Sequence, residues 1–296
     1  LQTIEAEMKN LRRLERAVDN VMETTVSRAK EKWGNIPIMG DGRIDFTDVF
    51  FMPEEESRRD AWERDKMRAV SWKSEWDKKD DALALLLNNE IEQKAYDASG
   101  NPAPDARYSS KAARAWRRYE SLRMADAFEK YKTHILGKFL GGDFLVMRAS
   151  IHDDIVNGID NVLVRASSGD VVCAFDEVVS ERDEAIAMKR DKVEKINIDS
   201  ARALSGGRVE YAMTLKNGKA EKISAPHVPI FYLYTSKDKL KERLRELGNT
   251  RAEEGAFIEL SEEISEQAAR FKAFPRKTIY TGCSDIFSVH CPSFLD

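Results

Sequence analysis

Residues 157–178, NGIDNVLVRASSGDVVCAFDEV, constrain the fold most, because they place carboxylates at the edge of two apolar runs. The runs predict two strands joined by a Ser-Ser-Gly-Asp turn. The second run, Val171 to Phe175, is apolar at every position, so both of its faces must be covered. Asp160 stands where the first run begins, and Asp176 and Glu177 follow the second. Charge at one end of a buried hairpin indicates a functional end of a sheet.

These carboxylates need compensation. In a hairpin closed near Ser168, Asp160 and Asp176 lie near each other across the ladder, where like charges destabilise a sheet. A divalent cation is a natural compensator, because Mg²⁺ is typically held by one or two carboxylates, water and substrate phosphate. Alternation puts Asp176 and Glu177 on opposite faces, and small Ala174 leaves room beside Asp176. We therefore expect Asp160 and Asp176 to bind Mg²⁺ or Mn²⁺, and Glu177 is the second choice for the position of Asp176.

A purely structural interpretation of the same residues is also open. Asp160 can cap its own backbone in a turn after Asn157-Gly158. Asp176 can form a salt bridge with Arg182 or Lys189.

The helix expected over residues 109–139 supplies a third carboxylate. Its core stripe is marked by apolar residues, Leu122, Ala125, Leu136 and Leu140. Glu129 lies on that stripe, where a carboxylate needs a partner or a metal. We expect Glu129 to complete the metal site.

The helix expected over residues 181–196 supplies lysines. Lys189 falls on its apolar stripe, and Lys192 lies on the adjacent ridge. A lysine brought to the sheet could orient an attacking water or stabilise charge on a phosphate.

The remaining pattern of the chain is that of an α/β protein built on a mixed sheet. Further strands are expected over residues 144–149 and 229–235, a second hairpin over 208–215 and 220–224 across Asn217-Gly218, and a helix over 237–247.

The order of these groups resembles the PD-(D/E)XK nuclease superfamily over about residues 109–247. The shared order is a helix with an acid, a hairpin whose two strands each carry an acid, then a helix and a strand. The resemblance implies a restriction-endonuclease-like core in which Glu129, Asp160 and Asp176 bind Mg²⁺. It also implies hydrolysis of nucleic acid, with DNA as the preferred candidate substrate. The segments NGIDNVL and CAFDEV also resemble a bacterial branch whose function the resemblance does not supply.

The chain departs from the superfamily at one position. A lysine two residues after the second acid assists the water there, and that position is Val178 here. In some members the lysine comes from the following helix. The resemblance then gives this role to Lys189 or, failing it, to Lys192.

Nucleic-acid binding is expected from one basic helical stretch. Phosphate contacts are expected from the cations of residues 111–123, which are Lys111, Arg114, Arg117, Arg118 and Arg123. Trp116 and Tyr119 are interleaved, either to stack on unpaired bases or to pack in the core. The net charge of −4 gives no global attraction to nucleic acid, so a local patch must supply it.

The N-terminal third is expected to be a mainly helical region over residues 1–100. Residues 1–33 have an apolar stripe, Ile4, Met8, Leu11, Leu14, Val18, Val21 and Thr25. This helix is either a coiled-coil arm for self-association or a helix packed on the body. Residues 54–95 are helical and charged, and residues 97–110 read as a linker before a core over 109–250. Residues 251–296 are expected to pack on that core as an extension.

Residues 40–50 resemble the second half of an EF-hand loop. Its first half lacks two carboxylates, because Pro37 and Met39 stand in their places. We therefore favour a glycine turn that leads into a strand from Ile44 to Phe51.

Cysteine content and hydropathy indicate the cellular compartment in which we expect the protein. Three scattered cysteines argue for a reducing compartment, and no apolar run approaches the ~20 residues of a membrane span, so we expect a cytoplasmic protein. The alternative function is a non-catalytic helical interaction or nucleic-acid-binding scaffold protein that keeps the fold without activity.

Overall fold

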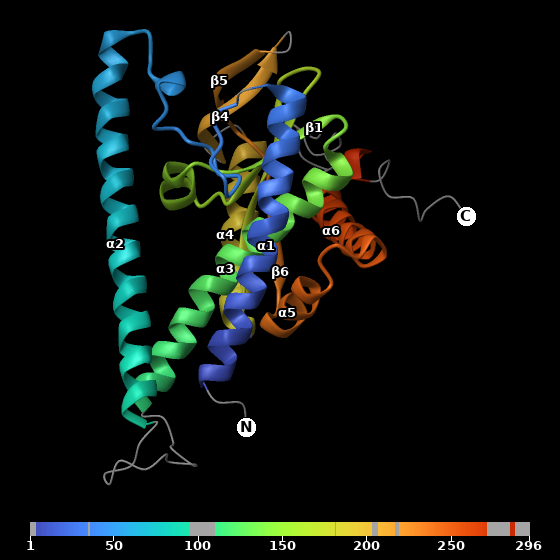
Figure 1. Ribbon diagram of the computed structural model, residues 1–296. Helices are drawn as coiled ribbons and strands as arrows, with labels where there is room; N and C mark the ends of the chain where they lie inside the picture. The colour runs from blue at the N-terminus through green and yellow to red at the C-terminus, as the bar shows by residue number, and fades with distance from the viewer. Residues whose placement is uncertain are drawn as a thin grey trace.

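The computed structural model has a mixed four-stranded sheet covered on both faces (Figure 1). The structure describes residues 4–34, 36–94, 110–180, 182–202, 207–216, 219–270 and 285–287. Residues 97–109 of the expected linker and most of the expected C-terminal extension beyond Arg270 lie outside these ranges, whereas residue 110 already begins a helix.

The sheet has the strand order β1-β2-β3-β6. Its strands are β1 (Phe144–Arg148), β2 (Asn161–Arg165), β3 (Val171–Val179) and β6 (Ile230–Thr235). β1, β2 and β3 are antiparallel neighbours, whereas β6 runs parallel to β3. The expected mixed sheet is confirmed. Apolar residues at successive positions, as in β3, fit burial on both faces.

One face of the sheet packs against helices. They are α1 (Ile4–Trp33), α3 (Ser110–Leu140), α5 (Lys237–Arg245) and α6 (Thr250–Arg270). Cys173 and Phe175 of β3 point into this layer, where they share one core with α1 and α3. The described part of the expected C-terminal extension, α6, packs on this face.

α1 is packed on the body and does not stand out as an arm. It lies along α3, with contacts such as Lys130 to Asp19 and Lys32 to the carbonyls of Gly141 and Gly142. Its buried residues are Ile4, Met8, Leu11, Leu14, Val18, Met22 and Val26. The last two replace the expected Val21 and Thr25, because a strict alternation of three and four residues repeats every 3.5 residues and drifts around a helix with 3.6 residues per turn.

The other face of the sheet is covered by α4 (Asp183–Ala201) and a separate hairpin. That hairpin joins β4 (Arg208–Lys216) to β5 (Lys219–Pro226), and it forms its own two-stranded sheet. Ala174 of β3 points into this layer together with Val193 of α4. The pairing of Lys216 with Lys219 confirms the expected two-residue connection, although residues 217 and 218 lie outside the described ranges.

α2 (Glu56–Lys94) is the long helix at the side of the molecule in Figure 1. Near its start, Trp62 Nε1 donates to the carbonyl of Phe46 at 3.1 Å. Further along, Asp80 forms an ion pair with Arg123 of α3. The helix therefore joins the two layers. No helix in the described part of the chain has the length and apolar character to cross a membrane.

The segment after α1 differs from the expected strand. Met39 N–H donates to the Arg43 carbonyl across a tight turn, in which Gly42 has φ of 82°. The backbone then pairs with β1 only around Arg43 and Ile44. The prediction of a strand to Phe51 was wrong, because Asp45 and Asp48 bond their own backbone neighbours, and a 3₁₀ turn, η1 (Val49–Phe51), follows.

Candidate metal centre

Three carboxylates converge at the end of the sheet where β2 begins. Glu129 comes from α3, Asp160 immediately precedes β2, and Asp154 comes from η2 (Asp153–Asn157), a single π-helical turn. One oxygen of each lies within 4.8 Å of the others. We call these three residues the carboxylate triad. The structure thus brings Glu129 and Asp160 together as expected.

The backbone of β3 fixes Asp160. The Asp160 N–H donates to the Phe175 carbonyl at 2.8 Å, and its Oδ2 accepts from the Glu177 N–H at 2.5 Å. Asp160 therefore continues the hairpin by one residue, and its carboxylate is oriented by the neighbouring strand. The expected turn cap within its own segment is not the contact observed.

A buried neighbour places Asp154. Asp153 accepts from the backbone N–H groups of Glu210 and Tyr211 at 2.7 and 3.0 Å, so β4 holds η2 in place. Gly158, at φ of 66°, ends the turn and directs the chain into β2. Since only glycine adopts this conformation freely, the Asn-Gly pair of the sequence serves this reversal.

Two arginines pair with the carboxylate triad. Arg148 donates to Glu129 Oε2 at 2.5 Å, and also to Asp126 and Asp41. Arg43 donates to Asp154 Oδ2 at 2.9 Å and to the same Glu129 oxygen at 3.3 Å. These arginines offset the charge of three carboxylates that would otherwise repel one another.

For two members of the triad, Glu129 and Asp160, burial is still the largest influence on the pKa. It raises the pKa of Glu129 from 4.5 to about 7, against the attraction of Arg148 and Arg43. Burial also raises the pKa of Asp160 well above its usual value, and the charges of Glu129 and Glu177 add to the rise. Carboxylates that resist ionisation in this way gain most from an added cation.

Asp176 lies outside the triad, where Asp154 takes the place expected for it. Strand alternation explains this, because Asp176 points to the α4 layer and binds Lys189 Nζ at 2.5 Å. The structural interpretation, a salt bridge with Lys189, therefore describes the resting arrangement. Glu177 points to the opposite layer, as the alternation predicts.

Glu177 belongs to a buried network with α3. It forms an ion pair with Lys132, and its Oε1 accepts from Asn161 Nδ2 at 2.7 Å. Burial lowers the pKa of Lys132 despite the attraction of Glu177. This network fixes the end of β3, whose Glu177 N–H orients Asp160.

Lys189 lies beside the carboxylates as expected. Its ammonium donates to the Glu177 carbonyl at 2.5 Å as well as to Asp176. Burial acts to lower the pKa of Lys189, but Asp160 and Asp176 raise it above its usual value. Lys192 is exposed one turn away, with its Nζ near the position of Gly158.

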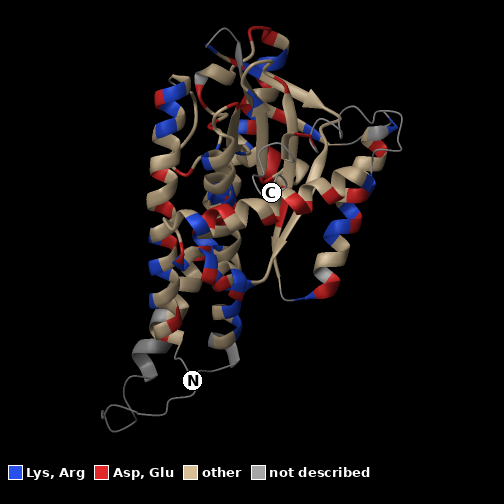
Figure 2. Cartoon of the chain, turned by 90° about the vertical axis from the view of Figure 1, so that its right-hand side faces the viewer, with Lys and Arg blue, Asp and Glu red and all other residues tan. Residues whose placement is uncertain are grey.

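The expected phosphate-binding cations differ in their surroundings. Arg114, Arg117 and Arg118 are exposed on α3, whereas Arg123 is engaged by Glu15 and Asp80. The side chain of Lys111 lies outside the described part of the chain. The aromatics Trp116 and Tyr119 are buried in the core, so of the two expectations for them, core packing is the one observed. Figure 2 shows charges of both signs interspersed along the helices.

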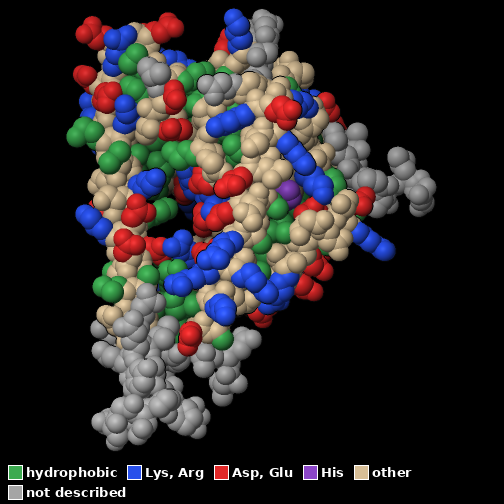
Figure 3. Space-filling view, in the orientation of Figure 1, with side chains coloured by type: hydrophobic (Ala, Val, Ile, Leu, Met, Phe, Trp, Pro, Cys, Tyr) green, Lys and Arg blue, Asp and Glu red, His purple; other side chains and the backbone are tan. Residues whose placement is uncertain are grey.

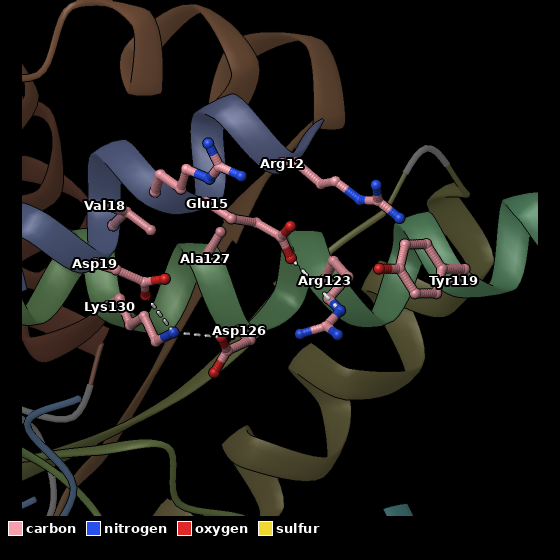
Figure 4. A pocket seen from close by; sticks show the side chains of 10 residues that line it. Arg12, Glu15, Val18, Asp19, Tyr119, Arg123, Asp126, Ala127 and Lys130 are labelled. Atoms are coloured by element: carbon pink, nitrogen blue, oxygen red, sulfur yellow. Dashed lines mark hydrogen bonds and ion pairs between the residues drawn. The ribbon is translucent and has the colours of Figure 1, made fainter. Parts of the chain in front are cut away.

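A groove lies between α1 and α3, with a volume of about 280 Å³ (Figure 4). Arg12, Glu15 and Asp19 line it from α1, and Arg123 and Lys130 line it from α3. Most of its charges are already paired, as the dashed contacts in Figure 4 show. Figure 3 likewise shows side chains of both signs around the hollow beside α2.

Sequence reasoning missed four members of the site, which are Arg43, Lys132, Arg148 and Asp154. The Asp153-Asp154 pair between two predicted strands was the available signal for the last of these. Comparison with protein-family models, curated proteins and solved structures found no match. The function is therefore argued from the geometry of the site.

Proposed function

We propose that this protein is a metal-dependent phosphodiester hydrolase that acts on nucleic acid, with DNA as the first candidate, and that its core is restriction-endonuclease-like. The observation that supports this most is the carboxylate triad beside Lys189 at one end of the mixed sheet. The order of α3, β1, β2, β3, α4 and β6 also follows the order that the sequence resemblance implies.

The triad fits Mg²⁺ or Mn²⁺. Its donors are all carboxylate oxygens, the ligand type that hard divalent cations select. Three acids from three separate elements lie within reach of one ion, and burial penalises the charge of two of them, Glu129 and Asp160. When bound, such an ion polarises a phosphate and lowers the pKa of a water.

The residues of the chain then have distinct roles. Glu129, Asp154 and Asp160 would hold the ion, and the backbone of β3 would keep Asp160 aimed at it. Lys189 stays protonated because its pKa is raised, so it would orient the water or neutralise developing charge and would not act as a base.

A second candidate function is a scaffold that keeps this fold without activity. It is favoured by the observation that Arg43, Arg148 and Lys189 already pair with the acids, and by Val178 at the position where the superfamily has lysine. The two candidates differ in whether the triad takes up a divalent ion.

Metal uptake is tested by thermal unfolding with and without Mn²⁺. We expect the ion at a hundredfold excess over its Kd to raise the Tm by about 5 °C. Asp160→Asn and Glu129→Gln should each abolish the rise, whereas Asp170→Asn in the exposed hairpin turn should keep it. A wild-type Tm that does not respond to Mn²⁺ or Mg²⁺ would support the scaffold.

Hydrolysis is tested on plasmid, linear and single-stranded DNA and on RNA with each ion. Cleavage by the wild type and by Asp170→Asn, together with its loss in Asp160→Asn, is the expected pattern. If the ion binds but every substrate survives, the fold serves recognition and the hydrolase proposal is wrong.

Substrate binding is tested with Arg117→Ala. We expect this change to weaken DNA binding. The slope of the logarithm of the binding constant against the logarithm of the salt concentration should fall in magnitude by about 1, because one phosphate contact is lost. The cleavage rate at saturating DNA should be unchanged. Arg251→Ala on α6 is the matched control. An unchanged salt slope would exclude Arg117 from the binding surface.

A further inference from the structure

Arg43 reaches the carboxylate triad from outside the sheet. It lies in the turn after α1, more than eighty residues before Glu129 in the chain. Its guanidinium donates to the Ala149 carbonyl at 3.3 Å, to Asp154 at 2.9 Å and to Glu129 at 3.3 Å. One cation therefore links two of the three triad carboxylates.

The backbone that carries Arg43 is fixed. Ile44 N–H donates to the Arg148 carbonyl, and Arg148 N–H donates to the Gly42 carbonyl, both at 3.0 Å. A side chain at Gly42 would meet Met22 of α1, so this turn is packed closely against the helix. The backbone at Arg43 is therefore held on both sides, and the side chain is the part of this residue that could change partners.

Arg43 is also more accessible than the other arginine of the site. Its side chain is 11% exposed, whereas that of Arg148 is 1% exposed. Arg148 is held by Asp41 and Asp126 as well as by Glu129, so it serves as a fixed structural counterion. Although burial acts to lower the pKa of Arg148, these carboxylates raise it, and the guanidinium stays charged.

We propose that Arg43 binds the substrate phosphate at the carboxylate triad, and that Glu129 and Asp154 pair with Arg43 until those carboxylates take up a cation. This inference rests on the proposed function. A guanidinium matches a phosphate with two parallel N–H donors, and its charge would no longer be needed by a metal-loaded triad.

The other cations of the site are less suited to this role. Lys132 is fully buried in its ion pair with Glu177. Lys189 presents a single ammonium that Asp176 and the Glu177 carbonyl already hold. The four described cations of the site are Arg43, Lys132, Arg148 and Lys189. Of these, Arg43 alone combines a partly exposed side chain with the forked set of N–H donors of a guanidinium.

The first test is the affinity for Mn²⁺, measured by calorimetry without substrate. Arg43→Met removes a cation that competes for two triad carboxylates, so we expect Mn²⁺ to bind about tenfold more tightly than to the wild type. Arg43→Lys should give an intermediate value. Arg251→Met on α6 should match the wild type. Unchanged or weaker Mn²⁺ binding in Arg43→Met would overturn the proposal.

The second test is the affinity for a short DNA duplex, measured with Ca²⁺ in place of Mg²⁺. Here the expectation reverses, and Arg43→Met should bind DNA about tenfold more weakly although its triad binds metal more tightly. A merely structural role for Arg43 would weaken both affinities together. DNA binding equal to that of the wild type would overturn the proposal.

A measurement on the wild type covers the case in which Arg43→Met does not fold. The NMR signals of the Arg43 side-chain N–H groups, assigned by their loss in Arg43→Lys, should change chemical shift when Mg²⁺ is added, because the guanidinium leaves its two carboxylates. Signals that do not move would exclude the exchange. If the wild type binds no divalent ion, the proposed function fails as well. If the wild type binds ions that Asp160→Asn does not, the proposed metal site is supported. The Arg43 tests then decide only the role of Arg43.

Discussion

At the residue scale, the two lysines beside β3 have separate tasks. Lys132 is buried against Glu177 and holds the end of the strand, so its removal would leave an uncompensated buried carboxylate. Lys189 lies closer to the surface, between Asp160 and Asp176, where both carboxylates keep it protonated. Of these two lysines, Lys189 is therefore the better candidate to touch substrate.

Lys189→Ala tests this assignment. We expect the cleavage rate at saturating DNA to fall about a hundredfold, because a charge contact formed in the transition state is lost. DNA binding should change less than threefold. Lys195→Ala, an exposed lysine of the same helix, should cut like the wild type. If Lys189→Ala and Lys192→Ala both keep full activity, no lysine of α4 assists the reaction.

At the element scale, one carboxylate fastens α5 to α3. Glu120 accepts from Lys237 at 2.9 Å and from Lys241 at 2.6 Å, and its side chain is mostly covered. Burial acts to raise the pKa of Glu120, but the hydrogen bonds from Lys241 and Lys237 lower it below its usual 4.5. Glu120 is thus a contact between helices.

This contact gives a pH-dependent prediction. Because the folded-state pKa is lowered, Glu120 stabilises the protein above pH 4.5, and this contribution is lost as the pH falls through the folded-state pKa. Glu120→Gln should cost about 2 kcal/mol at neutral pH. The difference from the wild type should shrink towards zero in acid, as measured by urea unfolding. Glu242→Gln, an exposed neighbour, should show neither effect. A cost that is constant with pH would mean that the charge of Glu120 is irrelevant.

At the scale of the whole molecule, the N-terminal helix is part of the core. α1 shares one buried cluster with α3, the sheet, α5 and α6, so residues 4–33 are not a separate appendage. The stripe that could have driven self-association is already covered within the chain. Self-association through this helix stays a prediction, and it would have to use the charged face.

Leu14→Ala probes that integration. Leu14 is 2% exposed, and its truncation should lower the free energy of unfolding by about 3 kcal/mol through a cavity in the shared core. Tryptophan fluorescence and far-UV circular dichroism should lose their signals in one coincident transition. Leu122→Ala, 51% exposed on α3, should change stability by less than about 0.5 kcal/mol. A transition of α1 alone, before the rest of the chain, would show that it is a separate unit.

The sequence by itself determined the strands of the sheet, its main helices and two members of the triad. Apolar alternation and the turn residues identified the hairpin of β2 and β3, and the expected mixed sheet followed from the order of elements. Glu129 was found because a carboxylate on an apolar helical stripe needs a partner. Asp160 was found because it begins a buried strand. Both signals are local, since they depend on residues within a few positions along the chain.

The tertiary structure alone decided which other groups meet these two carboxylates. Asp154 replaces Asp176 because β4 anchors η2 through Asp153, whereas strand alternation turns Asp176 towards Lys189. Arg43 and Arg148 enter because a turn more than one hundred residues away pairs with the end of β1. Contacts of this kind depend on how separate elements pack, and no periodicity within one element encodes them.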